Sequence, residues 1–277
     1  MRLCFGLQWR WLRAVAVSGV VGLVVLLGAT ASDARESAQA RPKPTVVLVH
    51  GAFADASSWS PVVSRLQRAG YPVVAPANPL RGLASDAAYV SSFLETLSGP
   101  LVLVGHSYGG AVITNAAVQH ANVTALVYIA AYIPDTGQAL KDLTPLPGTL
   151  LVPSALVLRP WTLADGSTGV DVSIDPRQFR TIFAADLPEE QTAVMAASQR
   201  PLSAQALFEP SAAAAWQTIP SWALVATQDN AIGTANVRAM AQHAHAHIVE
   251  VAGSHAVLLS RPDAVVRLIR AAARNDD

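Results

Sequence analysis

The stretch "LVLVGHSYGGAV", residues 101–112, decides the fold. Four apolar residues lead into Gly105-His106-Ser107-Tyr108-Gly109, and a second apolar run follows. The segment fits the G-x-S-x-G pattern, in which a strand turns sharply into a helix and carries a serine clear of the sheet. Glycines on both sides remove side chains that would collide in such a turn. A chance match in a glycine turn is the alternative, but the strand-to-helix context favours Ser107 as a nucleophile.

Short apolar runs recur along the chain outside this stretch. They are "TVVLVH" (45–50), "YPVVAP" (71–76), "PLVLVGH" (100–106), "ALVYIAAY" (125–132), "SWALVATQ" (221–228) and "HIVEVAG" (247–253). Continuous apolarity is typical of strands that are covered on both faces. The segments between them are helix-like: Asp86 can cap a helix over 87–97, and Pro262 suits the first helical position of 262–273. This alternation predicts an α/β fold with a mostly parallel sheet of about six strands flanked by helices.

Composition limits the classes of function. The chain has 277 residues, of which 52% are hydrophobic and 14% charged, with a formal net charge of zero. This is ample material for one domain with insertions, and nothing in it indicates a nucleic-acid surface or a polybasic membrane patch.

The N-terminus is typical of an export signal. Residues 1–31 combine an arginine-bearing start, an apolar core and the small-x-small site Ala29-Thr30-Ala31. An uncleaved anchor helix is the alternative, but the apolar run is short for a full span. Cleavage would remove Cys4, the only cysteine. We expect an exported protein without stable membrane association, with a linker over 32–44 and the folded domain over 45–277.

One interval breaks the alternation. Residues 134–217 contain many Pro, Asp and Gly and no clear strand. A structureless loop of this length is unusual, so we expect a partly helical lid over the carboxyl ends of the strands, where α/β sheets bind ligands. Trp161, Phe179 and Phe183 are candidate pocket walls, although such residues more often serve packing.

A serine nucleophile needs a base, usually a histidine held by a carboxylate. His255 lies in a small loop after the last predicted strand, where it can reach the elbow. Two acids compete for the third position, because Asp229 and Asp135 both follow strands that end at the same edge of the sheet. Asp229 is favoured, since one helix and one strand then lead to His255.

Other histidines have plainer interpretations. His243, His245 and His247 form "HAHAH", but their spacing and the lack of acidic or cysteine companions nearby disfavour a metal site. His50 precedes Gly51 at the end of the first strand and is expected to fix the loop by hydrogen bonding. The loop after it can bring a second backbone N–H to a developing oxyanion. The expected donors are Tyr108 and Ala52, with Phe53 less favoured as a donor but a candidate for substrate contact.

Residues from about Thr45 to Ala273 resemble the α/β-hydrolase superfamily, in the esterase branch that includes plant methylesterases and hydroxynitrile lyases. The segments that carry the resemblance are "VHGAFADASSW", "GHSYGG" and "ATQDNAIGTANVRAMAQHAHAHIVEVAGSHAVLLSRPDAV". The resemblance implies an α/β-hydrolase domain over 45–277 and Asp229 as the acid. It also argues against a hydroxynitrile lyase, because that branch has Thr at the position of Gly51 and Lys at that of Ala256.

The expected activity is that of a serine carboxylesterase acting on a small-molecule ester without a metal or organic cofactor. Hydrolysis of a lactone or a C–C bond, or acyl transfer, needs the same three side chains and stays an alternative. A non-catalytic binding protein on this scaffold is less favoured, because no member of the expected triad is missing.

Overall fold

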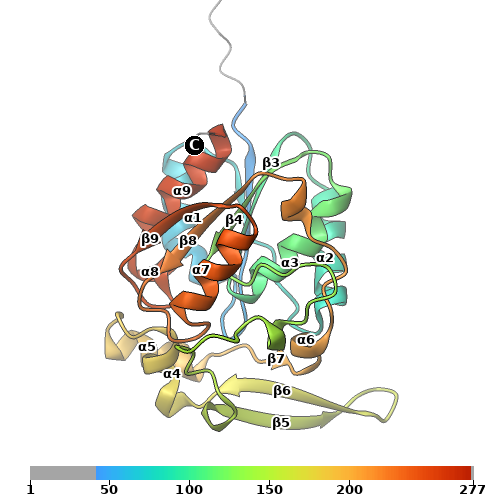
Figure 1. Cartoon of the computed structure of the whole chain (residues 1–277), viewed down its shortest axis with the longest axis vertical. Coiled ribbons are helices and arrows are strands. Elements are labelled where there is room, and N and C mark those ends of the chain that lie inside the picture. Colours follow the sequence, from blue (N-terminus) through green and yellow to red (C-terminus); the bar gives the residue numbers. More distant parts are fainter. Residues whose placement is uncertain (1–41, 276–277) are drawn as a thin grey trace, which may run out of the picture. The chain divides into compact units, whose positions relative to one another are not determined.

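The computed structural model describes residues 42–275 of the chain, and its central element is a six-stranded parallel sheet (Figure 1). The strand order is β2-β1-β3-β4-β8-β9. The bounds are β1 Thr45–Val49, β2 Val73–Val74, β3 Leu101–His106, β4 Val123–Ile129, β8 Ser221–Ala226 and β9 His247–Val251. The expected fold class is therefore confirmed. Five of the six apolar runs contain one of these strands, and the run 125–132 overlaps β4.

Helices cover both faces of this sheet because the strands are apolar on both sides. Val46 and Leu48 of β1 pack in a cluster with residues of α1 (Ser60–Arg68), α8 (Val257–Ser260) and α9 (Pro262–Arg274). Val47 and Val49 point the other way, into a cluster with residues of α2 (Leu83–Glu95), α3 (Tyr108–Ala116) and α7 (Thr234–His243). This alternation is the two-residue period of a strand.

The register of the strands aligns their carboxyl ends. Val49 of β1 pairs with Gly105 of β3, and Ala226 of β8 pairs with Val251 of β9. In parallel sheets, the loops that follow such ends form the ligand-binding edge. The loops that carry the candidate site residues all leave the sheet at this edge.

The insertion between β4 and β8 contains strands, which we did not expect. An antiparallel sheet in the order β5-β6-β7 consists of β5 (Leu156–Thr162), β6 (Thr168–Ile174) and β7 (Leu202–Ser203). Helices α4 (Pro176–Phe183), α5 (Glu189–Ala197) and α6 (Gln205–Phe208) accompany it. Figure 1 shows β5 and β6 below the parallel sheet, on its carboxyl-end side. Asp165-Gly166 at the hairpin turn, with φ of 83° at the glycine, is the type of signal that marks such a hairpin.

Helix starts agree with the sequence in one case and differ in another. Pro262 is the first residue of α9, as expected. The expectation that Asp86 caps its helix is wrong, because α2 begins at Leu83 and Asp86 lies in its first turn, fully buried. Its carboxylate accepts hydrogen bonds from Tyr108 and Arg81 instead.

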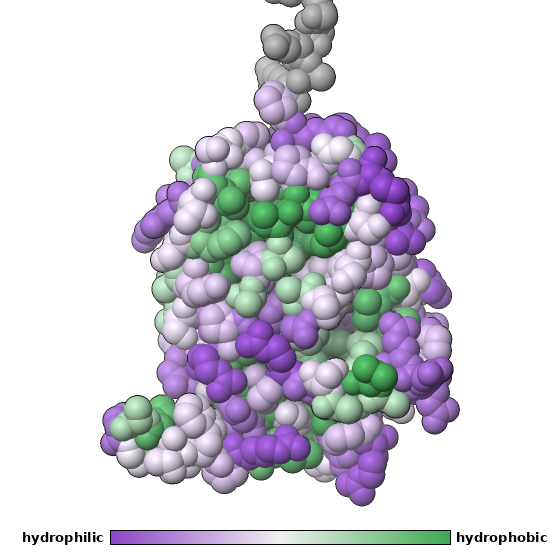
Figure 2. All heavy atoms as spheres, turned by 180° about the vertical axis from the view of Figure 1, so that it is seen from behind, coloured by the Kyte–Doolittle hydropathy of each residue, from purple (hydrophilic) through white to green (hydrophobic). Residues whose placement is uncertain are grey.

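The surface has mixed character. Figure 2 shows the reverse face, with hydrophilic residues over much of it and a hydrophobic group in its upper half. Among residues 42–275, no helix is long and apolar enough to span a membrane. The predicted export signal, residues 1–31, and nearly all of the predicted linker lie outside the described residues.

Candidate active site

The turn that carries Ser107 is strained, as a nucleophile elbow requires. Ser107 connects β3 to α3 with φ of 53° and ψ of −124°, a conformation that non-glycine residues rarely adopt. Two glycines make room for it. A Cβ on Gly109 would lie 2.4 Å from the carbonyl oxygen of Val49, and one on Gly105 would lie 2.6 Å from that of Gly109. No side chain fits at either position, so the pattern G-x-S-x-G here is a steric requirement.

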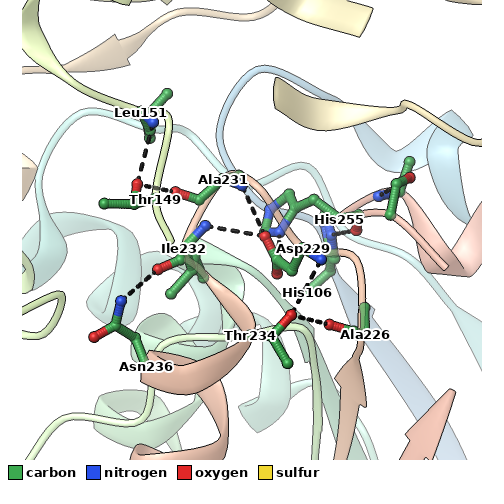
Figure 3. A network of polar contacts seen from close by, with 12 residues as sticks. His106, Thr149, Leu151, Ala226, Asp229, Ala231, Ile232, Thr234, Asn236 and His255 are labelled. Atoms are coloured by element: carbon green, nitrogen blue, oxygen red, sulfur yellow. Dashed lines mark hydrogen bonds and ion pairs between the residues drawn. The ribbon is translucent and has the colours of Figure 1, made fainter. Parts of the chain in front are cut away.

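His255 and Asp229 form a buried pair. The Nδ1 atom of His255 lies 2.8 Å from Oδ2 of Asp229, and the two side chains are 1% and 0% exposed. The other carboxylate oxygen, Oδ1, accepts the backbone N–H groups of Ala231 (2.8 Å) and Ile232 (3.0 Å), as Figure 3 shows. Three hydrogen bonds therefore fix the carboxylate, and the carboxylate fixes the imidazole.

Asp135, the alternative acid, lies elsewhere. Its carboxylate contacts Nε2 of His243 on α7 and accepts a hydrogen bond from Gln217 at 3.2 Å. It borders a different surface pocket, of about 240 Å³, which His243 also lines. The structure thus brings Asp229, and not Asp135, to His255.

The remaining histidines near the elbow are buried and support the loops around it. Nε2 of His50 accepts the backbone N–H of Asn78 at 2.9 Å, so its Nδ1–H donates to the carbonyl of Gly51. Nε2 of His106 donates to the carbonyl of His255 at 2.9 Å. Burial lowers the pKa of His50, and lowers that of His106 well below the usual value. Both rings are accordingly neutral at pH 7.

The "HAHAH" segment is occupied by aromatic contacts. His243 meets Trp216 edge to face, with the ring centres 5.3 Å apart, and His247 stacks on Trp222 at 5.0 Å. Within the described part of the chain, no three His, Cys, Asp or Glu side chains come together as metal ligands would.

The loop after β1 approaches the elbow closely. A Cβ on Gly51 would lie 2.6 Å from Cβ of Ser107, so only glycine fits there. The N–H of Phe53 donates to the carbonyl of Arg200 at 3.0 Å and is therefore engaged. Ala52 lies between these two residues in the cavity wall. Tyr108 is the first residue of α3, where N–H groups have no partner within the helix. This geometry favours Ala52 over Phe53 as the partner of Tyr108 in an oxyanion hole.

A buried acid supports the elbow from behind. The hydroxyl of Tyr108 donates to Oδ2 of Asp86 at 2.7 Å, and the N–H of Arg81 donates to both carboxylate oxygens at 3.0 and 3.1 Å. Burial raises the pKa of Asp86 and of Tyr108. Sequence reasoning missed this pair because the two residues are 22 positions apart and belong to different helices.

These residues enclose a small, mostly apolar cavity of about 30 Å³, which has room for a few water molecules. Of the predicted site residues, its walls include Ala52, Phe53, Ser107, Tyr108, Phe183 and His255. The walls that sequence reasoning missed are Tyr132, Leu140, Leu151, Leu202, Leu207, Ala231 and Ile232. All of these except Tyr132 are aliphatic residues in irregular or short segments, where no periodicity marks a pocket.

Two further candidate pocket walls differ in position. Phe179 stacks on Phe183, with the ring centres 5.1 Å apart, and supports it. Trp161 lies on β5 with 44% of its surface exposed, outside the cavity walls. Phe183 also meets the ring of His255 at 4.9 Å, so the insertion reaches the candidate base directly.

The insertion is tied to the acid loop as well. The side chain of Asn236 accepts the N–H of Leu146 and donates to its carbonyl, at 2.9 and 3.0 Å. The hydroxyl of Thr149 donates to the carbonyl of Ala231 at 2.6 Å and accepts the N–H of Leu151 (Figure 3). The loop that holds the candidate acid therefore also holds one wall of the cavity.

Comparisons with known proteins bear on the family and the fold. The family described as "Alpha/beta hydrolase family" matches residues 46–268. The hydrolase nvfD of Aspergillus novofumigatus is 28% identical over 254 residues, covering 83% of this chain and 97% of that protein. A carbendazim-hydrolysing esterase of Nocardioides is 32% identical over 112 residues, which is 36% of this chain and 46% of that esterase. That match thus spans about half the length of the esterase.

Solved structures share the fold at low sequence identity. Polyneuridine aldehyde esterase superposes with a TM-score of 0.71 at 17% identity, over 82% of this chain and 98% of that one. A pyrethroid hydrolase of Sphingobium faniae has a TM-score of 0.67 at 23% identity, with coverages of 83% and 97%. A mutant of tomato methylketone synthase I has a TM-score of 0.68 at 20% identity, covering 85% and 99%. Because the family match covers residues 46–268, which are most of this chain, the chain belongs to the alpha/beta hydrolase family.

Proposed function

We propose that the protein is a serine carboxylesterase that cleaves a small carboxylic ester through an acyl-enzyme. The observation that carries the proposal is the buried His255–Asp229 pair, 2.8 Å apart, whose imidazole borders the same cavity as the strained Ser107. The esterases among the similar proteins support the ester as the bond class.

The proposed reaction gives each of these groups a defined role. Oγ of Ser107 attacks the ester carbonyl and gives its proton to Nε2 of His255, while Asp229 holds Nδ1–H and stabilises the imidazolium. The N–H groups of Ala52 and Tyr108 hold the tetrahedral oxyanion. His255 then protonates the departing alcohol, and later takes a proton from the water that releases the acid.

The substrate is an uncharged small molecule in this proposal. Apart from the reacting groups, the cavity walls are aliphatic or aromatic, and a charged group there would lose its hydration without a partner. We also propose export of the mature chain, on the strength of residues 1–31 of the sequence.

The test is hydrolysis of p-nitrophenyl acetate and butyrate by residues 32–277, beside Ser107→Ala and the control Ser92→Ala. Ser92 is an exposed residue of α2, outside the catalytic cavity walls. We expect turnover by the parent and the control, and loss of about 10³-fold or more in Ser107→Ala. Equal activity of the Ser107 variant would contradict the proposal, as would a folded parent without turnover on these or longer esters.

A further inference from the structure

Phe53 forms part of the wall of two separate cavities. It lines the catalytic cavity of about 30 Å³, and it also lines an outer pocket of about 190 Å³. The other walls of the outer pocket are Ala54, Asp55, Ser57, Ser58, Gln191, Met195, Ser198 and Leu259. The larger pocket of about 240 Å³ beside α7 has a different set of walls. Phe53 is thus a wall that the catalytic cavity and the outer pocket share.

Hydrogen bonds hold the backbone around Phe53, so an opening of the wall at this point requires a rotation of its side chain. Phe53 has φ of 65°, and its N–H donates to the carbonyl of Arg200. Two residues further on, the carboxylate of Asp55 accepts the N–H of Ser57 at 2.7 Å and begins the turn η1 (Ala56–Trp59). The Phe53 residue itself is 8% exposed.

The catalytic cavity is too small to hold a whole ester. Ligand pockets typically measure about 300 to 1,000 Å³, an order of magnitude more than the space at Ser107. The part of a substrate that extends beyond its carbonyl therefore needs a second space. The outer pocket borders the loop after β1 through Phe53, and the segment after His255 through Leu259. Leu259 belongs to α8, four residues after His255, and α8 lies above α5 in Figure 1.

The chemistry of the outer pocket selects against an anion. Met195, Leu259 and Ala54 give it apolar surface, while hydrogen bonding to Ser57 lowers the pKa of Asp55 and keeps it charged. The hydroxyl groups of Ser58 and Ser198 already donate to the carbonyls of Asp55 and Val194. Between an anionic and an uncharged chain, the pocket therefore favours an uncharged alkyl or aryl group.

We propose that Phe53 partitions the substrate-binding space, and that the outer pocket receives the extended, uncharged chain of the ester when this ring moves aside. Phe53 is thereby the residue that sets chain-length preference. The inference rests on the proposed function, because it assumes that Ser107 is the reacting residue.

The test uses ethyl alkylphosphonofluoridates whose alkyl group is methyl or octyl. Oγ of Ser107 forms a bond to phosphorus, the P–F bond breaks, fluoride leaves, and the serine proton passes to His255. Labelling rates are read by intact mass and need no ester turnover. Phe53→Ala should raise the octyl-to-methyl rate ratio at least about tenfold, and Phe53→Leu should raise it less. The methyl reagent also reports whether each variant retains its fold.

Two matched variants locate the effect. Ser198→Phe places a ring in the outer pocket and should remove most of the octyl gain when combined with Phe53→Ala. Leu158→Ala shortens an exposed side chain of β5 that is a wall of neither cavity, and should change the ratio less than about threefold.

The outcomes separate the two proposals. If the parent is labelled but Phe53→Ala leaves the ratio unchanged, the partition is wrong and the nucleophile stands. If the double variant keeps the full octyl gain, the chain does not enter through the outer pocket and the inference is likewise wrong. If neither reagent labels the folded parent at Ser107, the proposed function fails, and this inference fails with it.

Discussion

Replacing Asp229 by Asn exchanges a carboxylate oxygen for an amide nitrogen and traps the imidazole of His255 in the wrong tautomer. Oδ1 of Asp229 accepts two backbone N–H groups, from Ala231 and Ile232, while Oδ2 faces Nδ1 of His255. An amide at this position keeps its oxygen toward the two N–H groups, because a flipped amide would leave both donors unpaired at about 1–3 kcal/mol each. The amide NH₂ then faces His255, whose Nδ1 must accept. Its Nε2 must consequently carry the proton and cannot take one from Ser107.

The expected magnitude follows from this locked orientation. The corresponding change in serine proteases lowers kcat by about 10⁴-fold, and we expect a loss of about 10³- to 10⁴-fold here. At about 1.4 kcal/mol per factor of ten, this is about 4 to 5.5 kcal/mol of transition-state stabilisation. The fold should persist, because the two N–H groups keep their acceptor.

The assay is kcat/KM for p-nitrophenyl butyrate, with circular dichroism and thermal unfolding as checks on structure. Asp135→Asn is the matched control, since Asp135 contacts His243 in a partly exposed pair, and such pairs contribute little. It should change kcat/KM less than about threefold. A folded Asp229→Asn enzyme within tenfold of the parent would refute the reasoning, as would equal damage from Asp135→Asn.

Three further predictions concern stability. His106 is fully buried with a lowered pKa, so the unfolded chain binds its proton first as the pH falls below about 6.5. Acidification from pH 7 to 5.5 should therefore cost about 1.3 kcal/mol of unfolding free energy through this residue. In denaturant titrations, His106→Asn should lose less unfolding free energy than the parent between pH 7 and pH 5.5. An equal loss in the variant and the parent would contradict this prediction. Asn236→Ala removes two hydrogen bonds to Leu146 and one to the carbonyl of Ile232, and should lower the unfolding free energy by about 2–3 kcal/mol in the same titration. A change below about 0.5 kcal/mol would contradict this. Tyr108→Phe leaves the carboxylate of Asp86 without its hydroxyl donor and should lower the unfolding free energy by about 1–3 kcal/mol. Burial raises the pKa of Asp86, so this loss should become smaller as acid protonates the carboxylate and removes the charge that the hydroxyl stabilises. A loss independent of pH would show that Asp86 does not act through its charge.

The parallel sheet and the elbow could be predicted because their causes are local. Apolar runs form buried strands wherever helices cover both faces, and Gly105 is required because a Cβ there would lie 2.6 Å from the carbonyl oxygen of Gly109, in the same turn. The order of elements then places the loops that bear Asp229 and His255 at one edge. The sequence favours Asp229 over Asp135 by this order and by the family resemblance, and the structure shows the distance that supports the preference.

The insertion could not be predicted equally well. Its strands β5 and β6 are partly exposed and carry Arg159 and Pro160 among apolar residues, so they lack the continuous apolarity of the central strands. Cavity walls such as Leu151 and Leu202 come from loops and short elements, and only tertiary packing brings them to Ser107. Trp161 is a candidate wall by its size, but size alone does not place a residue in a pocket.

The most direct test of the central claim is to find the acyl group. The protein is quenched in acid during turnover of p-nitrophenyl butyrate, digested, and mapped by mass spectrometry. The account predicts a butyryl group on Ser107, on the peptide that contains Gly105–Gly109, and none in Ser107→Ala. Turnover with the butyryl group on another residue, or undiminished turnover in Ser107→Ala, would contradict it.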